Sequence, residues 1–313
     1  MVRLPWASVL KGVLSMAYSR NAKTRRDSLA GMLFVTPTLL GVLAFTVFPV
    51  LASLAASFTN WNFLKGLNGL KFVGLTNYVR MLTDEWFTGS LRNNLLFTIV
   101  VVPATLAIAA ILAVIVNDRI YAKGAVRAMI FMPHISSVVA ISFVWLLLLE
   151  PKAGPINRLL MALGIDHPPG WLASTSWALP GLMIMSIWAG IGYNMIIYLA
   201  ALQGIPGELY EASALDGATG WRKFWYITLP MVRPSTFFLA ITGIIGSFKV
   251  FGAISVMTQG GPGTSTSVVA YYVYQSGFRF MKMGYASAMA WVLFAIIFVV
   301  TLIQWIYQKR LSY

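Results

Sequence analysis

The segment LRNNLLFTIVVVPATLAIAAILAVIV, Leu91–Val116, decides which class of fold this chain can adopt. Its one charged residue, Arg92, stands next to the start, and the stretch beyond it is almost entirely apolar. A bilayer core about 30 Å thick is crossed by roughly 20 helical residues, because a helix satisfies every backbone N–H and C=O within the segment. The segment therefore predicts a membrane-spanning helix.

Five further segments have a similar length and composition. They cover residues 29–58, 125–149, 177–202, 236–258 and 285–307. Prolines within the six segments, such as Pro37, Pro49, Pro103 and Pro133, are tolerated in membrane helices and predict kinks. We therefore expect an all-α integral membrane protein with about six transmembrane helices.

The overall composition agrees with this class of protein. Hydrophobic residues make up 58% of the chain and charged residues only 10%, against roughly a quarter charged in soluble proteins. The net charge of +14 is spread between apolar blocks instead of forming one basic face, so we expect no nucleic-acid partner. Absence of cysteine excludes disulfides and thiolate metal sites, and with His134 and His167 as the only histidines we expect no metal site.

The distribution of Lys and Arg predicts the orientation. If the N-terminus is cytoplasmic, the inside segments carry fourteen basic residues and the outside segments eight, which favours both termini in the cytoplasm. We expect a cytoplasmic tail over residues 1–28, one six-span domain over 29–308 and a short C-terminal tail over 309–313. The first tail is either mobile or an amphipathic helix along the membrane surface.

A polar island, EASALDGATGWRKFWYITLP, covers Glu211–Pro230 between the fourth and fifth predicted spans. We expect two short helices hinged at Gly217, with Asp216 capping the turn that follows and Pro230 ending the second helix. Such an elbow projects from the membrane and can present its acidic and aromatic residues to a soluble partner. An ordinary amphipathic loop is compatible with the same composition.

The island also carries a family resemblance. Glu211-Ala212-Ser213, followed by Gly217 and by Ile227 with Leu229-Pro230, resembles the EAA signature of permease subunits in binding-protein-dependent ABC importers. Ser213 stands where the third alanine of the signature is usual. The fuller form EASALDGA is similar to the carbohydrate branch, which includes the maltose, multiple-sugar and glycerol-3-phosphate permeases. Further similar segments are FVGLTNYVRML from Phe72, FMPHISSVV from Phe131, IWAGIGYNMIIYLAALQGIP from Ile187, MTQGGPGTST from Met257 and GYASAM from Gly284, so that about residues 29–308 are covered.

The resemblance implies a type I ABC importer permease in a bacterial or archaeal cytoplasmic membrane. It would form half of a pore with a second homologous permease, rest on two ATPase subunits and receive a saccharide from an extracytoplasmic solute-binding protein. The coupling loop, about residues 204–233, would dock in the ATPase, with Glu211 paired to a basic group there. The residues implied in ATPase coupling are Glu211, Ala212, Ser213, Leu215, Asp216, Gly217, Ala218, Ile227 and Pro230.

The chain lacks the Gly-x-x-x-x-Gly-Lys-Ser/Thr sequence of a phosphate-binding loop. ATP and magnesium are therefore expected on partner subunits, with no cofactor and no catalytic residue in this chain. A secondary transporter or channel would show inverted repeats and buried acids for ion coupling, whereas the acids here lie in loops or at span ends. An intramembrane enzyme would need a catalytic constellation, and none is found.

Lys249 lies within the fifth predicted span, where a charge is costly and marks a functional candidate. It suggests an acidic cargo, such as a uronate oligosaccharide or a sugar phosphate. A lysine that extends to the interface or pairs with a carboxylate of another subunit explains the charge equally well.

In the fourth span, Trp188, Tyr193 and Asn194 combine aromatic faces with an amide, which suits a sugar. Helix packing and an interfacial aromatic belt are the alternative. The predicted substrate path consists of Trp188, Tyr193, Asn194, Ser247, Lys249 and Phe251. The turn-rich loop from Gln259 would lie outside, either as a docking loop for the binding protein or as a plain flexible connector.

Overall fold

The computed structural model describes residues 31–66, 70–118 and 123–311. The predicted tail over residues 1–28 lies outside this range. The chain divides into two compact units, residues 1–55 and 56–313, which are described separately. Within the described residues the regular structure is helical, apart from one isolated antiparallel bridge between Thr59 and Phe72.

The first unit carries an apolar helix whose described part is Gly31–Ser57, and Ala56 and Ser57 belong to the second unit. It includes the π-helical turn η1 (Leu43–Val47) and then α2 (Phe48–Ser57). The wider turn shifts the backbone hydrogen bonds directly before Pro49, which has no N–H to donate. The helix is therefore altered at one of the prolines where a kink is predicted.

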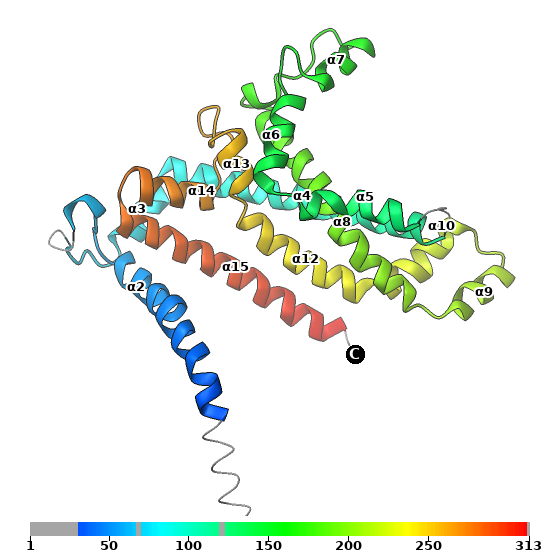
Figure 1. Cartoon of the computed structure of the whole chain (residues 1–313), viewed down its shortest axis with the longest axis horizontal. Helices are drawn as coiled ribbons and strands as arrows, with labels where there is room; N and C mark the ends of the chain where they lie inside the picture. The colour runs from blue at the N-terminus through cyan, green and yellow to red at the C-terminus, as the bar shows by residue number, and fades with distance from the viewer. Residues whose placement is uncertain (1–30, 67–69, 119–122, 312–313) are drawn as a thin grey trace, which may run out of the picture. The chain divides into compact units, whose positions relative to one another are not determined.

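The second unit contains the remaining helices, drawn in Figure 1. They are η2 (Phe63–Lys65), α3 (Thr76–Thr83), α4 (Glu85–Asp118), α5 (Lys123–Ile135), α6 (Val138–Leu148), α7 (Pro155–Ala162), η4 (Trp171–Ala173), α8 (Ala178–Gln203), α9 (Gly207–Leu215), α10 (Gly220–Lys223), η5 (Phe224–Thr228), α11 (Leu229–Met231), α12 (Arg233–Phe248), α13 (Gly252–Met257), α14 (Val269–Tyr274), η6 (Gln275–Arg279) and α15 (Met283–Leu311).

The described part of the chain holds five helices long and apolar enough to cross a membrane, or six if α5 and α6 count as one bent span. Helix α4 runs through Pro103 as one element. The prediction of about six spans is confirmed, and so is the kink predicted near Pro133 in the third span, which the structure shows as a sharp break between two helices. Helices α5 and α6 meet at an angle of 98° across Ser136 and Ser137. The bend follows Pro133, which removes a helical hydrogen bond near the end of α5.

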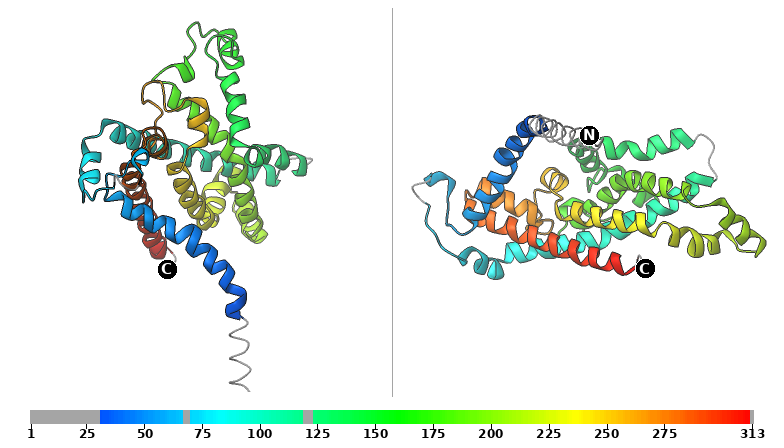
Figure 2. Two further views of the ribbon diagram at one scale, coloured as in Figure 1. Left: turned by 60° about the vertical axis from the view of Figure 1, so that its left-hand side comes forward. Right: turned by 90° about the horizontal axis from the view of Figure 1, so that it is seen from below.

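The core forms where α8 packs against α4 and α5, and where α12 packs against α4. Figure 1 and Figure 2 show α4, α8 and α12 side by side. The contact between α5 and α8 depends on Gly192, because a Cβ atom there would lie 2.2 Å from the carbonyl oxygen of Ile130. A glycine thus allows the two backbones to touch.

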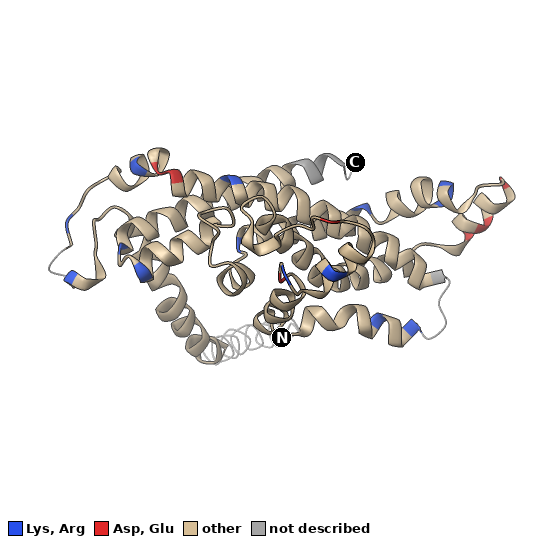
Figure 3. Cartoon of the chain, turned by 90° about the horizontal axis from the view of Figure 1, so that it is seen from above, with Lys and Arg blue, Asp and Glu red and all other residues tan. Residues whose placement is uncertain are grey.

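Many large apolar side chains stay exposed on the outer sides of the long helices. Phe298 on α15 is 57% exposed and Ile99 on α4 is 67% exposed. Figure 3 shows that most charged residues lie instead in connections and near helix ends. This distribution is that of helices that contact lipid or other membrane subunits.

Candidate functional site

The polar island between α8 and α12 folds as the predicted elbow. Its first arm, α9, ends with the Gly217 N–H donating to the Ala214 carbonyl at 3.1 Å and the Ala218 N–H to the Ser213 carbonyl at 2.9 Å. Gly217 has a φ of +71°, in the left-handed region that favours glycine. The sharp turn therefore lies at the predicted glycine.

The second arm is a helical run made of α10, η5 and α11. Its N-terminal cap is Thr219, whose side chain accepts a hydrogen bond from the Arg222 N–H. The prediction that Asp216 caps this arm is wrong, because Asp216 is the C-terminal cap of α9. Thr219 takes the role because its extended backbone aims the hydroxyl at the first turn.

Pro230 does not end the second arm, which continues to Met231. Within the arm, the π-helical turn closes with the Leu229 N–H donating to the Phe224 carbonyl. This shift in the hydrogen-bond pattern comes directly before Pro230, and the proline then occupies the first turn of α11, where a missing N–H is tolerated.

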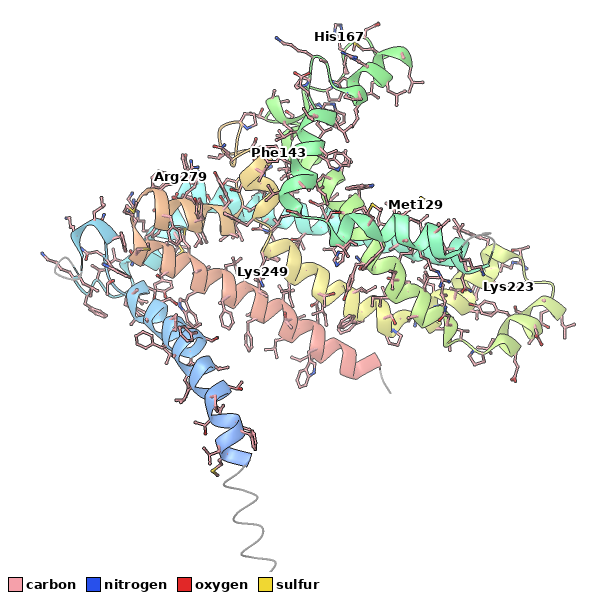
Figure 4. All side chains as sticks on the ribbon, viewed as in Figure 1. Met129, Phe143, His167, Lys223, Lys249 and Arg279 are labelled. Atoms are coloured by element: carbon pink, nitrogen blue, oxygen red, sulfur yellow. The ribbon has the colours of Figure 1, made fainter. Side chains whose placement is uncertain are left out.

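The two arms are joined by side-chain hydrogen bonds. The Tyr210 hydroxyl and the Thr228 hydroxyl lie 2.9 Å apart. Lys223 Nζ donates to the Tyr210 carbonyl at 3.4 Å. Thr228 is buried and Tyr210 is half-buried. These contacts, which sequence reasoning did not identify, fix the angle between the arms; Lys223 is labelled in Figure 4.

The residues implied in ATPase coupling divide into an outward face and a supporting side. The exposed ones are Glu211, Ala212, Leu215, Asp216 and Gly217, and the partly buried ones are Ser213, Ala218, Ile227 and Pro230. Leu215 is 91% exposed and lies one helical turn after Glu211, so an acid and an apolar side chain share one surface. Both residues are exposed on this surface.

A cavity of about 200 Å³ lies between α4, α8 and α12. Its lining residues are Phe97, Val101, Val102, Thr105, Leu106, Ser186, Gly190, Asn194, Leu239, Gly243, Gly246, Ser247 and Val250. Of the predicted substrate path, only Asn194 and Ser247 belong to this set. Trp188, Tyr193, Lys249 and Phe251 do not line the cavity.

The cavity combines apolar walls with a few polar groups. Thr105 Oγ1 is buried and has no hydrogen-bond partner in the described residues. Asn194 Nδ2 donates to the Gly190 carbonyl at 2.8 Å, and Ser247 Oγ shares a hydrogen bond of 2.7 Å with Thr98. Hydroxyl and amide groups set in an apolar surface suit a small polar ligand with apolar faces.

Lys249 is the C-terminal cap of α12, at the break before α13, and its side chain is exposed. Lys249 thus lies within the candidate span Arg233–Met257, as predicted, but at a break between two helices that the sequence did not indicate. The helix ends here because the Lys249 N–H bonds to the Gly246 carbonyl in a tighter turn, and Phe251 has a non-helical backbone. Figure 4 shows Lys249 at this break.

The aromatic residues of the predicted path pack against neighbouring helices. Trp188 meets Trp145 edge to face with ring centroids 5.7 Å apart, and Phe251 packs on Tyr274 at 5.2 Å. Tyr193 stacks on His134 at 4.9 Å, so this histidine serves packing between α8 and α5. Within the described residues, no three His, Asp or Glu side chains are arranged to hold a metal ion.

Sequence reasoning missed the polar face of α4. Asn94, Thr98 and Thr105 are separated by four and seven residues, which places them on one side of a helix, and this spacing within an apolar segment was the available signal. Asn94 is fully buried; its Nδ2 donates to the Ser247 carbonyl at 3.1 Å and its Oδ1 accepts from the Val269 N–H at 3.1 Å.

The turn-rich loop after α13 is attached to the same helix. Asn93 Nδ2 donates to the carbonyls of Thr264 and Ser267 at 3.0 and 2.9 Å, and Ser90 shares a hydrogen bond of 2.8 Å with Ser267. Thr266 closes the loop on itself by donating to the Gly261 carbonyl. The loop is thus held in place by α4, which argues against a plain flexible connector.

Comparisons with known proteins identify the type of protein. Residues 88–313 match the family described as "Binding-protein-dependent transport system inner membrane component". The lactose transport system permease protein LacF of Rhizobium radiobacter is 36% identical over 291 residues, covering 91% of this chain and 96% of that protein. The arabinooligosaccharides transport system permease protein AraP of Bacillus subtilis is 30% identical over 304 residues, covering 96% and 93%.

The fold is also that of solved transporter chains. A chain of a bacterial ABC transporter involved in the import of the acidic polysaccharide alginate has a TM-score of 0.80 at 23% identity, covering 94% of this chain and 100% of that one. A second structure of a bacterial alginate ABC transporter, with an alginate pentasaccharide-bound periplasmic protein, gives 0.79 at 25% identity, covering 93% and 97%. The all-α type I importer fold is thereby confirmed. The chain belongs to the family of inner membrane permease components of binding-protein-dependent ABC importers.

Proposed function

We propose that this chain is the membrane-spanning permease subunit of an ATP-driven importer of sugars or oligosaccharides. Relatives named for lactose, arabinooligosaccharide and sn-glycerol-3-phosphate transport support this class of cargo. The observation that carries the proposal is the elbow, which presents Glu211 and Leu215 outward and is internally braced by Tyr210 and Thr228.

The elbow converts the closing of the ATPases into movement of the membrane helices. It connects α8 to α12, and both of these helices line the cavity. A rigid connection passes a displacement to the helices that it joins, whereas a flexible loop absorbs it. Docking of the Glu211 surface in an ATPase cleft therefore changes the side of the membrane to which the cavity opens.

The cavity is this subunit's part of the saccharide path. Asn194 and Ser247 provide an amide and a hydroxyl, and Thr105 offers a hydroxyl without a protein partner in the described residues. Because a buried unpaired hydroxyl is costly, a hydroxyl-rich ligand that binds it regains this energy. A second, homologous permease completes the path.

The cargo is acidic, either a uronate oligosaccharide or a sugar phosphate. Lys249 is exposed, and its neighbours Ser247 and Val250 line the cavity, so a cation stands beside the path. Two solved structures with this fold belong to transporters of alginate, and the first of them is described as importing 'the acidic polysaccharide alginate'. An ammonium at this place favours a carboxylate or phosphate over a neutral sugar.

The assembly comprises a second permease, two ATPase subunits that bind ATP and magnesium, and an extracytoplasmic solute-binding protein. No cofactor is assigned to this chain, and hydrolysis belongs to the ATPases. The transporter acts in the cytoplasmic membrane of a bacterium or archaeon, with both termini of this chain in the cytoplasm.

The coupling role is tested by Glu211→Lys in the complete transporter, reconstituted in liposomes with its binding protein. We expect loss of uptake and loss of cargo-stimulated ATP hydrolysis while the subunits still assemble. Asp166→Lys, at an exposed acid in a different loop, is the charge-matched control and should transport normally. Normal uptake by the Glu211 variant would contradict the proposal, as would accumulation of solute by the isolated chain.

The acidic cargo is tested with Lys249→Gln. Uptake of a uronate oligosaccharide should fall about tenfold or more, whereas uptake of a neutral oligosaccharide of equal length should change little. An equal loss with both cargoes would show that Lys249 has a structural role and does not select charge.

A further inference from the structure

A second cavity, of about 510 Å³, lies where α4 and α15 begin. Its volume is in the range of sites for small organic ligands. It is separate from the saccharide path, since no residue lines both cavities. The residues that matter for its chemistry are Asp84, Glu85, Arg80, Lys282, Trp86 and Phe280.

Asp84 is a fixed anion in the wall of this cavity. Its Oδ2 accepts hydrogen bonds from the hydroxyls of Tyr272 at 2.8 Å and Tyr285 at 2.6 Å, and its Oδ1 accepts from the Trp86 N–H at 2.9 Å. Burial opposes the charged form, but these hydrogen bonds outweigh burial and hold the pKa of Asp84 below its usual value. The carboxylate is thus satisfied by neutral donors and needs no cation.

The two cations of the cavity are consequently available to a ligand. The Arg80 guanidinium lies 5.1 Å from the centre of the Tyr285 ring, and Lys282 Nζ lies 5.9 Å from the centre of the Phe280 ring. Both side chains are exposed, as is the acid Glu85. Trp86 and Phe280 are each 44% exposed and add an aromatic surface, with ring centroids 6.3 Å apart.

The charged residues of the cavity lie at the ends of two candidate membrane spans. Helices α4 and α15 are two of the candidate membrane spans, and these spans begin at Glu85 and Met283, directly beside the charged residues. Trp side chains are enriched at this level of a bilayer because the ring is apolar and its N–H is polar. A ligand that reaches the cavity from the membrane is therefore a lipid.

We propose that this cavity binds the headgroup of a zwitterionic phospholipid, with the phosphate between Arg80 and Lys282 and the ammonium toward Glu85. The two cations and the two carboxylates, Asp84 and Glu85, sum to no net charge, which matches a neutral headgroup that carries both signs. A purely anionic headgroup would meet the repulsion of Glu85, and a neutral sugar would leave the exposed charges without partners.

The test uses the assembled transporter and native mass spectrometry, with phosphatidylethanolamine and phosphatidylglycerol as probes. The wild type should retain phosphatidylethanolamine in preference to phosphatidylglycerol. The double change Arg80→Gln and Lys282→Gln should weaken phosphatidylethanolamine binding about tenfold, whereas Arg92→Gln, at an exposed arginine of α4 outside the cavity, should not.

A second variant separates a headgroup site from general loss of structure. Glu85→Gln leaves the site with a net positive charge, so lipid preference should shift toward phosphatidylglycerol while binding persists. Unchanged binding in the double variant, or unchanged preference in Glu85→Gln, would overturn the proposal. Displacement of the retained lipid by a soluble uronate oligosaccharide would also overturn it, because the cavity would then be a saccharide site.

Discussion

The hydrogen bond between Tyr210 and Thr228 joins the two arms of the elbow, and its removal should loosen the coupling of ATP hydrolysis to transport. Tyr210→Phe deletes a hydroxyl that lies 2.9 Å from its partner and leaves the buried Thr228 hydroxyl without it. A neutral hydrogen bond contributes about 0.5–1.5 kcal/mol, and a buried unsatisfied group costs about 1–3 kcal/mol. Since 1.4 kcal/mol is a factor of ten, the equilibrium constant that favours the correct angle of the elbow should fall by roughly two- to a hundredfold.

The double change Tyr210→Phe with Thr228→Val removes both polar partners. It should therefore cost less than the sum of the two single changes, with an interaction energy of about 1 kcal/mol. The assay is the number of ATP molecules hydrolysed per saccharide imported by the reconstituted transporter. This ratio should rise in each single variant because ATPase closure no longer moves α8 and α12 as one piece.

Tyr226→Phe is the matched control, because Tyr226 belongs to the same elbow and is 80% exposed. It should leave the ratio at the wild-type value. Strict additivity of the two single changes, together with an unchanged ratio, would refute the reasoning.

Three more variants test the packing, the cavity and the acid at the start of α4. Gly192→Ala places a Cβ atom 2.2 Å from the Ile130 carbonyl oxygen, so it should lower the free energy of unfolding by about 1–3 kcal/mol or more and reduce the melting temperature of the complex. Gly246→Ala is the control, because no atom lies within 4 Å of the added Cβ, and it should melt like the wild type. Equal melting temperatures of the two variants would contradict the close contact of α5 and α8. Thr105→Val removes a buried hydroxyl that has no hydrogen-bond partner in the described residues, so the free energy of unfolding should stay the same or rise by up to about 1 kcal/mol, while saccharide uptake should fall. A clear loss of stability would show that the hydroxyl bonds to another group of the protein. The pKa of Asp84 in the folded protein is below the ordinary value of 3.8, so the carboxylate's contribution to stability is complete above about pH 4 and is lost as the pH falls through the folded pKa. Asp84→Asn should therefore lack this part of the acid destabilisation in thermal unfolding below pH 4. Parallel plots of melting temperature against pH for the wild type and the variant would refute this reasoning.

The sequence by itself determined the membrane class, the approximate spans and the position of the bend in the elbow. The spans follow from composition because each apolar segment must satisfy its backbone groups internally, and a helix is the local way to do so. The bend at Gly217 follows from one residue, because the left-handed turn there suits glycine and little else. These properties depend on residues close together in the chain.

Only the tertiary structure decided which faces of the helices meet and where the helices break. Helix α8 is apolar on all sides, so its sequence did not tell that Asn194 faces a cavity while Trp188 packs on Trp145. The structure also decided that the fifth span breaks at Lys249, where α12 ends, and that Tyr210 and Thr228 meet across the bend of the elbow. Such contacts join residues far apart in the chain. In a helix that is apolar on all sides, the sequence shows no difference between its faces, so it does not indicate which face packs against a neighbour.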